Sequence, residues 1–180
     1  MESFFVHENL LRSSLPHLLP ARSNRTVHLQ HDSPEVFAIY LHWLYYGTLP
    51  TKDTAAIDPD PTPEYLDLAT ACAFGAKFEC FEFHNAAMDA LVTMMNKNNI
   101  DNIRSPDILV KYAYSRPASG KALHRVLVDM YLCHATADLL DRGNWEHGHN
   151  IQDFLLDIAR GSLGRDLSKC EPLDPSNYHI

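Results

Sequence analysis

One segment, residues 32–47, constrains the fold more than any other part of the sequence. It begins with Asp32-Ser33-Pro34, in which Asp32 or Ser33 can cap free backbone N–H groups and Pro34 has the backbone angle of a first helical turn. It ends at Gly47, which adopts a left-handed conformation at a helix end at little cost. Between these limits, apolar side chains cover more than one stripe of a helix: they are Val36, Phe37, Ile39, Tyr40, Leu41, Trp43 and Leu44. We therefore expect a helix over residues 34–46 that forms the buried centre of the fold.

Helical patterns continue through the rest of the chain. Thr62-Pro63 and Ser105-Pro106 have the residue types of helix starts, and apolar residues recur every three or four positions up to Lys97, where a polar break follows. Small residues on the apolar face of the segment that begins at Thr62 permit close packing with a companion helix. The predicted helices after Gly47 cover about residues 62–76, 83–97, 106–114, 123–131 and 154–158.

Two short segments have the alternating pattern of strands. Phe4–His7 is aromatic and β-branched, and Thr26–Leu29 alternates between polar and apolar residues. The order strand, helix, strand, helix, followed by a mainly helical half, predicts an α+β fold with a small β-sheet. We divide the chain into a domain over 1–97, a helical extension over 98–160 and a loosely ordered tail over 161–180.

Composition limits the function. The 180 residues suffice for one core, and 15 basic against 23 acidic side chains give a net charge of −8. This charge disfavours nucleic acids and anionic membranes, because both attract lysine and arginine. We also expect no membrane-spanning helix, since no stretch has about eighteen uninterrupted apolar residues. The start of the chain has no secretion signal, which predicts a location inside the cell, in the nucleus or the cytoplasm.

Three segments in order, over about residues 4–95, carry a family resemblance. Residues 5–14 read FVHENLLRSS, residues 32–47 contain DSPEVF and WLYYG, and residues 65–91 contain YLDL, FGAKF and HNAAMDAL. Together they resemble the BTB/POZ domain, in the version abundant in filamentous fungi, and residues 112–131 resemble the helical extension of those proteins. The positions that match the family's motifs are Phe5, His7, Leu11, Asp32, Pro34, Phe37, Trp43, Tyr46, Gly47 and Asn85.

The matching residues have scaffold roles. We expect His7 to hydrogen-bond nearby backbone, Trp43 and Tyr46 to fill volume between helices, and Gly47 to end a helix. The resemblance implies a non-enzymatic protein-interaction module that takes protein partners and assembles as a homodimer or acts as an adaptor, with no cofactor. It also implies a strand before Phe5, so we expect an N-terminally incomplete domain with an open sheet edge.

Two alternatives remain open. The family's cullin-binding members carry an apolar-x-Glu motif where this chain has Leu18–Arg25, which contains no glutamate, so a cullin ubiquitin-ligase adaptor is expected only through another surface. A metal-binding protein or enzyme would use His147 and His149, with Glu146 or Cys133, although their spacing is not that of a zinc site. The remaining candidate is a partner surface made by Arg12, Arg22 and Arg25, a positive stretch in an acidic chain.

Overall fold

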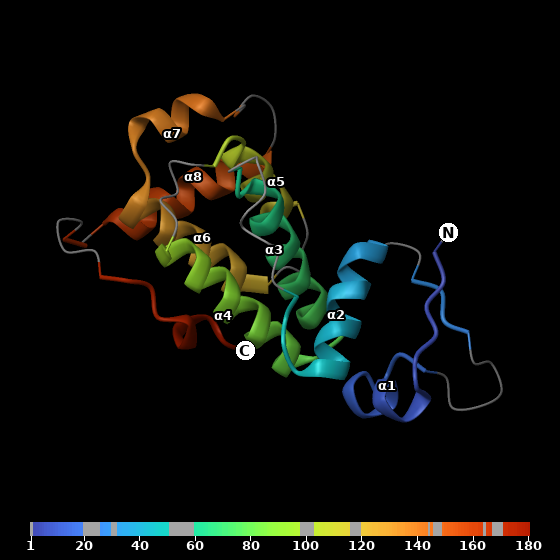
Figure 1. Cartoon of the computed structure of the whole chain (residues 1–180). Helices are drawn as coiled ribbons and strands as arrows, with labels where there is room; N and C mark the ends of the chain where they lie inside the picture. The colour runs from blue at the N-terminus through green and yellow to red at the C-terminus, as the bar shows by residue number, and fades with distance from the viewer. Residues whose placement is uncertain are drawn as a thin grey trace.

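The computed structural model describes residues 2–19, 26–29, 32–50, 60–97, 103–115, 120–143, 145, 149–163, 165–166 and 171–180. Helices α3 to α8 are grouped into one body, and α1 and α2 lie at one end of it beside the N-terminal segment (Figure 1). The helices are α1 Glu8–Ser14, α2 Pro34–Tyr46, α3 Thr62–Lys77, α4 Phe81–Lys97, α5 Pro106–Tyr114, α6 Gly120–His134, α7 Ala137–Arg142 and α8 His149–Ser162, with a short 3₁₀ helix, η3, at Pro175–Tyr178.

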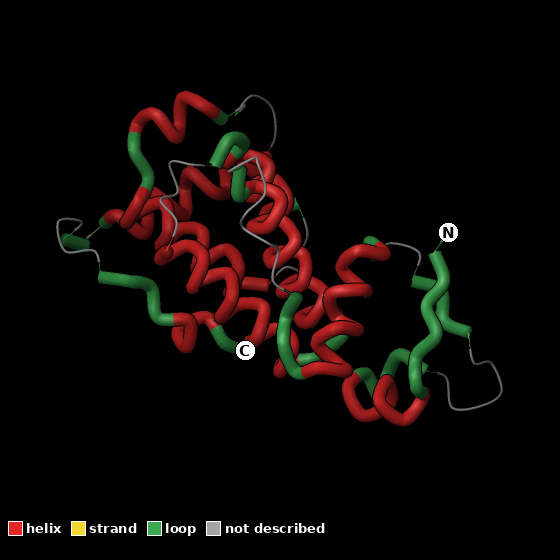
Figure 2. The backbone as a smooth tube through the Cα atoms, viewed as in Figure 1, coloured by secondary structure: helices red, strands yellow, loops and turns green. Residues whose placement is uncertain are grey.

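The predicted α+β fold class is wrong, because the described residues contain helices and loops but no strand and no β-sheet (Figure 2). Residues 4–7 and 26–29, the expected strands, are loop segments. The alternation that suggested strands is still visible in burial: Phe4 and Val6 pack partly against the core, whereas Phe5 between them is 99% exposed. Alternation selects which side chains face inward, but a strand also needs a hydrogen-bonded neighbour, and no backbone hydrogen bond among the described residues joins these two segments.

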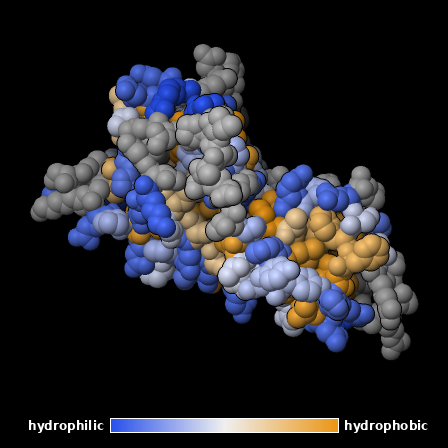
Figure 3. Space-filling model, in the orientation of Figure 1, coloured by the Kyte–Doolittle hydropathy of each residue, from blue (hydrophilic) through white to orange (hydrophobic). Residues whose placement is uncertain are grey.

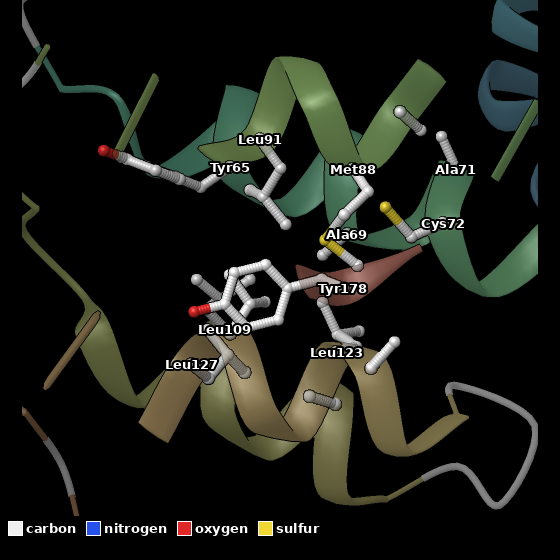
Figure 4. Packing of buried hydrophobic residues seen from close by; sticks show 14 of the residues in the cluster. Tyr65, Ala69, Ala71, Cys72, Met88, Leu91, Leu109, Leu123, Leu127 and Tyr178 are labelled. Atoms are coloured by element: carbon white, nitrogen blue, oxygen red, sulfur yellow. The ribbon is translucent and has the colours of Figure 1, made fainter. Parts of the chain in front are cut away.

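Helices α3 and α4 form the centre of the fold and pack closely against each other. At Gly75 on α3 there is no room for a side chain: a Cβ atom would lie 2.7 Å from the backbone nitrogen of His84 on α4. The turn between the helices is tight, with the Cys80 N–H donating to the Gly75 carbonyl at 2.8 Å. Figure 4 shows the packing around this pair. The largest fully buried side chains are Tyr40, Tyr65, Phe83, Phe154, Leu15, Met88, Leu91, Ile103, Leu109, Leu123 and Leu127.

Helix α2 is not the buried centre that the sequence predicted. Its buried residues are Val36, Phe37 and Tyr40, while Tyr45 and Tyr46 are exposed. The reason is its position: α2 lies at one end of the molecule, between the α3–α4 pair and the N-terminal segment, so part of its surface reaches solvent (Figure 1). Apolar content therefore predicted the helix correctly but not its place in the fold. The apolar residues of α2 that are only partly buried are Ile39, Leu41, Trp43 and Leu44.

The ends of α2 agree with the sequence in part. Ser33 is the N-cap and Pro34 opens the first turn, but no side chain caps the helix, because the Ser33 hydroxyl donates to Glu35 instead. Asp32, the other expected cap, forms an ion pair with Lys77 at 2.7 Å. Gly47 ends the helix with φ of +70°, as predicted.

The division of the chain at residues 97 and 160 stays a prediction, although α4 ends at Lys97 as the polar break indicated. In the predicted tail over 161–180, residues 171–180 lie against α4 and α6, and Leu173 and Tyr178 are buried. Helix α7 and the 3₁₀ helix η3 had no counterpart in the sequence prediction. No helix in the described ranges combines the length and the apolar character needed to cross a bilayer.

We predict that Gly75→Ala lowers the free energy of unfolding by about 1–3 kcal/mol, because the new methyl group overlaps the α4 backbone. The sign is diagnostic, since glycine-to-alanine in a free helix stabilises it by about 1 kcal/mol. Gly161→Ala in α8 is the matched control: its Cβ meets only the side-chain ends of Leu132 and Val128, which can move. Urea unfolding of both variants tests this, and equal effects would contradict the close packing at Gly75.

Candidate interaction surface

The N-terminal segment is fastened to α2 by His7 and Tyr45. The Tyr45 hydroxyl accepts a hydrogen bond from the His7 backbone N–H at 3.0 Å and lies 2.7 Å from the His7 Nδ1 atom. The two rings meet edge to face, with centroids 5.7 Å apart. His7 was expected to bond nearby backbone. Its partner is instead a side chain 38 residues away, so the local pattern around His7 could not reveal it.

An open depression of about 430 Å³ lies beside this contact. His7, Glu8, Asn9 and Leu10 form it at the start of α1, and Tyr45 of α2 completes it. Leu10 is 38% exposed, so the depression has an apolar side chain in reach of solvent. The depression is shallow and open to solvent, so an aromatic side chain of a partner can lie against it but would not be enclosed.

Two further aromatic residues that are close in sequence to those of the depression are exposed. Phe5 is 99% exposed, and Tyr46 is 73% exposed. The prediction that Tyr46 fills volume between helices is therefore wrong. Tyr46 is the last residue of α2, and its side chain lies outside the region where α2 packs against other elements. Figure 3 shows hydrophobic residues gathered over α2 and the N-terminal segment. We define the aromatic surface as Phe5, His7, Leu10, His42, Tyr45 and Tyr46.

His42 supports Tyr46 from one turn earlier in α2. Its ring lies 4.8 Å from the Tyr46 ring, and its Nδ1 atom is 2.8 Å from the Thr48 carbonyl oxygen. The contact with His42 thus restricts the rotation of the exposed Tyr46 ring.

The aromatic surface rests on aromatic packing beneath it. Phe4 meets Phe37 edge to face at 5.2 Å, and Tyr40 meets Phe83 of α4 at 5.2 Å. Trp43 lies 5.3 Å from Phe83, so it fills volume between helices as predicted. Burial raises the pKa of Tyr40 to about 12, which keeps its hydroxyl neutral. These ring contacts therefore connect α2 and the N-terminal segment, which carry the aromatic surface, to the core.

The proposed arginine surface is only partly described. Arg12 lies on α1 and pairs with Glu8 one turn earlier, at 2.8 Å, so its charge is partly balanced. Both side chains are more than 40% exposed, and such pairs contribute little to stability. Arg22 and Arg25 lie outside the described residues. The arginine surface therefore stays a prediction.

The other predicted positions divide between core and surface. Leu11 and Phe37 are buried, and Asn85 on α4 bonds the backbone of Ile180. His147 and the side chain of His149 lie outside the described residues. Among the described residues, no group of three or more histidine, cysteine, aspartate or glutamate side chains could hold a metal ion.

Comparison with known proteins found no matching family model, no matching curated protein and no matching solved structure. The resemblance to the BTB/POZ domain consequently stays a prediction from the motifs. The site must be interpreted from its own geometry.

Sequence reasoning missed Leu10, His42 and Tyr45 as surface residues. The sequence weakly indicated that Tyr45 is exposed, because it stands just before Tyr46 and Gly47 at the end of an apolar helix, where the buried face of the helix ends. The scaffold role expected for Phe5 is wrong, because its side chain is 99% exposed; alternation with Phe4 and Val6 already requires one of the two phenylalanines to face outward.

We predict that Tyr45→Phe, which removes the hydroxyl that contacts His7, releases the N-terminal segment from α2. The lost hydrogen bonds should cost about 1 kcal/mol locally. Faster amide hydrogen exchange over residues 4–8, with the exchange of α4 unchanged, is the expected result. Tyr46→Phe is the matched control because that ring is mostly exposed. Equal exchange in the two variants would show that the hydroxyl contact does not hold the segment.

Proposed function

We propose that this chain is a non-enzymatic protein–protein interaction module, related to the BTB/POZ domain, and that a second copy of the chain binds at the aromatic surface. The observation that supports it best is the unequal burial of α2. The α3–α4 pair and the N-terminal segment cover parts of this helix, yet Tyr45 and Tyr46 at its end and Phe5 on the neighbouring segment remain exposed.

The residue types of the surface favour protein binding. Tyrosine and phenylalanine are enriched in the cores of protein interfaces, and a few buried aromatic anchors commonly supply most of the binding energy. His7 and Tyr45 fix the depression before any partner arrives, which lowers the ordering cost of binding.

A second copy is the proposed partner because the aromatic surface combines a projecting side chain, Phe5, with a depression. Phe5 projects from the N-terminal segment with 99% of its surface exposed, and the depression lies two residues further along the chain. A twofold dimer brings the same patch of both copies together, so Phe5 of each copy can lie against the depression of the other. One patch therefore supplies both halves of a self-complementary contact.

The order of the motif segments supports the family relationship. The first motif segment spans the N-terminal segment and α1, the second covers α2, and the third covers the α3–α4 pair. These elements are consecutive and their side chains belong to one core. The sheet that the resemblance also implied is not part of the proposal.

We predict that the wild-type chain self-associates and that Phe5→Ser and Tyr46→Ser each weaken association at least about tenfold, the effect of losing a hot-spot aromatic residue. Leu163→Ser is the matched control, because Leu163 is 79% exposed but follows α8, away from the aromatic surface. Sedimentation velocity over a concentration series measures the dissociation constants.

A wild-type chain that remains monomeric at millimolar concentration would contradict the proposal. So would a dimer that Leu163→Ser weakens as much as Phe5→Ser does, since the interface would then not be the aromatic surface. Circular dichroism of each variant checks that the helices are retained.

A further inference from the structure

The last described segment, residues 171–180, lies across two helices and has the features of a bound peptide. We call it the strap. It crosses α4 and α6, and its 3₁₀ helix η3 lies between these helices in Figure 4. Only Leu173 and Tyr178 are buried, and most of the other strap residues are exposed. Two buried anchors in an otherwise exposed segment are typical of a bound peptide.

Helix α4 binds the strap backbone through two asparagines. Asn96 accepts from the Leu173 N–H at 3.0 Å and donates to the Leu173 carbonyl at 2.8 Å. Asn85 accepts from the Ile180 N–H at 3.1 Å and donates to the Ile180 carbonyl at 3.5 Å. Each amide therefore bonds both backbone groups of one residue. Such contacts hold an extended chain whatever its side chains are.

Helix α6 supplies the site for the second anchor. The Tyr178 hydroxyl donates to Asp129 at 2.8 Å, and Arg165 holds the same carboxylate from the other side at 2.5 Å. Arg125 donates to the Asn177 carbonyl at 2.7 Å and lies over the Tyr178 ring at 5.7 Å. A tyrosine fits this site in both shape and polarity, because its ring is covered and its hydroxyl has a carboxylate partner.

The strap also brings its own turn. The Asp174 carboxylate accepts from the Ser176 N–H at 2.9 Å and from the Ser176 hydroxyl at 2.8 Å, and Pro175 begins η3. These bonds lie within the segment, so an isolated peptide of this sequence can form them before it binds. Preformed turns lower the ordering cost of binding.

We propose that the surfaces of α4 and α6 that the strap covers, which we call the strap groove, form a peptide-binding site for segments of the pattern Leu-Asp-Pro-Ser-x-Tyr, and that the chain's own strap occupies it in cis. A partner protein with such a segment binds by displacing the strap. This site is separate from the aromatic surface, so it does not depend on the function proposed above.

Because the strap is part of the same chain, it competes strongly with a free peptide for the site. A short tether gives an effective concentration of about 1 mM, so a free peptide with an intrinsic dissociation constant of about 10 μM binds roughly 100-fold more weakly while the strap is in place. Weakening the strap without changing the groove should therefore reveal the site.

The test measures binding of a fluorescent peptide, Glu171–Ile180, to the full-length chain by anisotropy. We expect Tyr178→Ala in the chain to strengthen peptide binding at least about tenfold over wild type, because the strap no longer fills the anchor site. Ile108→Ala, at a 43% exposed side chain on α5 that belongs to neither proposed site, is the matched control and should behave as wild type. Adding Asn96→Ala to the Tyr178→Ala chain should weaken binding, as should replacing the tyrosine of the peptide by alanine.

A second strap variant keeps the test decisive if Tyr178→Ala does not fold. Leu173→Ala empties the other anchor, and the wild-type peptide should bind this chain and raise its melting temperature. The proposal is overturned if a folded strap variant binds the peptide no better than wild type does, or if the alanine peptide binds equally well. It is also overturned if neither strap variant folds, since the strap would then be an inseparable part of the core.

Discussion

The close contact between α3 and α4 at Gly75 sets the positions of the other elements. Because the two backbones meet there without an intervening side chain, Phe74 of α3 and Phe83 of α4 both reach the rings of α2. The opposite side of α4 then presents Asn85 and Asn96 to the strap. The close contact at Gly75 thus places the aromatic surface near one end of α4 and the strap groove along the α4 face that carries Asn85 and Asn96.

The two proposed sites differ in the way they are filled. The aromatic surface has fixed geometry, because His7 and Tyr45 hold it, but the described residues leave Phe5 and Tyr46 facing solvent. The strap groove is already occupied, with both anchors buried and the backbone bonded at two points. An exposed surface of this kind favours constant association, whereas an occupied groove responds only to a ligand that outcompetes the tether.

Sequence predicted the helices better than their arrangement. Pro34, Pro63 and Pro106 mark helix starts by local chemistry, and Gly47 marks an end, so these elements could be located without the fold. Whether a strand forms depends on a neighbouring backbone, which the alternation at Phe4–His7 cannot specify. The same limit applies to the sites: Tyr45 and Asn85 act through residues 38 and 95 positions away. Only packing brings such pairs together.

Association of the chain through the aromatic surface is tested most directly by hydrogen exchange with mass spectrometry on dilute and concentrated wild-type protein. We expect slower exchange on association in residues 2–19 and 34–50, with residues 103–115 and 149–163 unchanged. Slower exchange confined to α5 and α8 in an associated sample, or no change in residues 2–19, would contradict it.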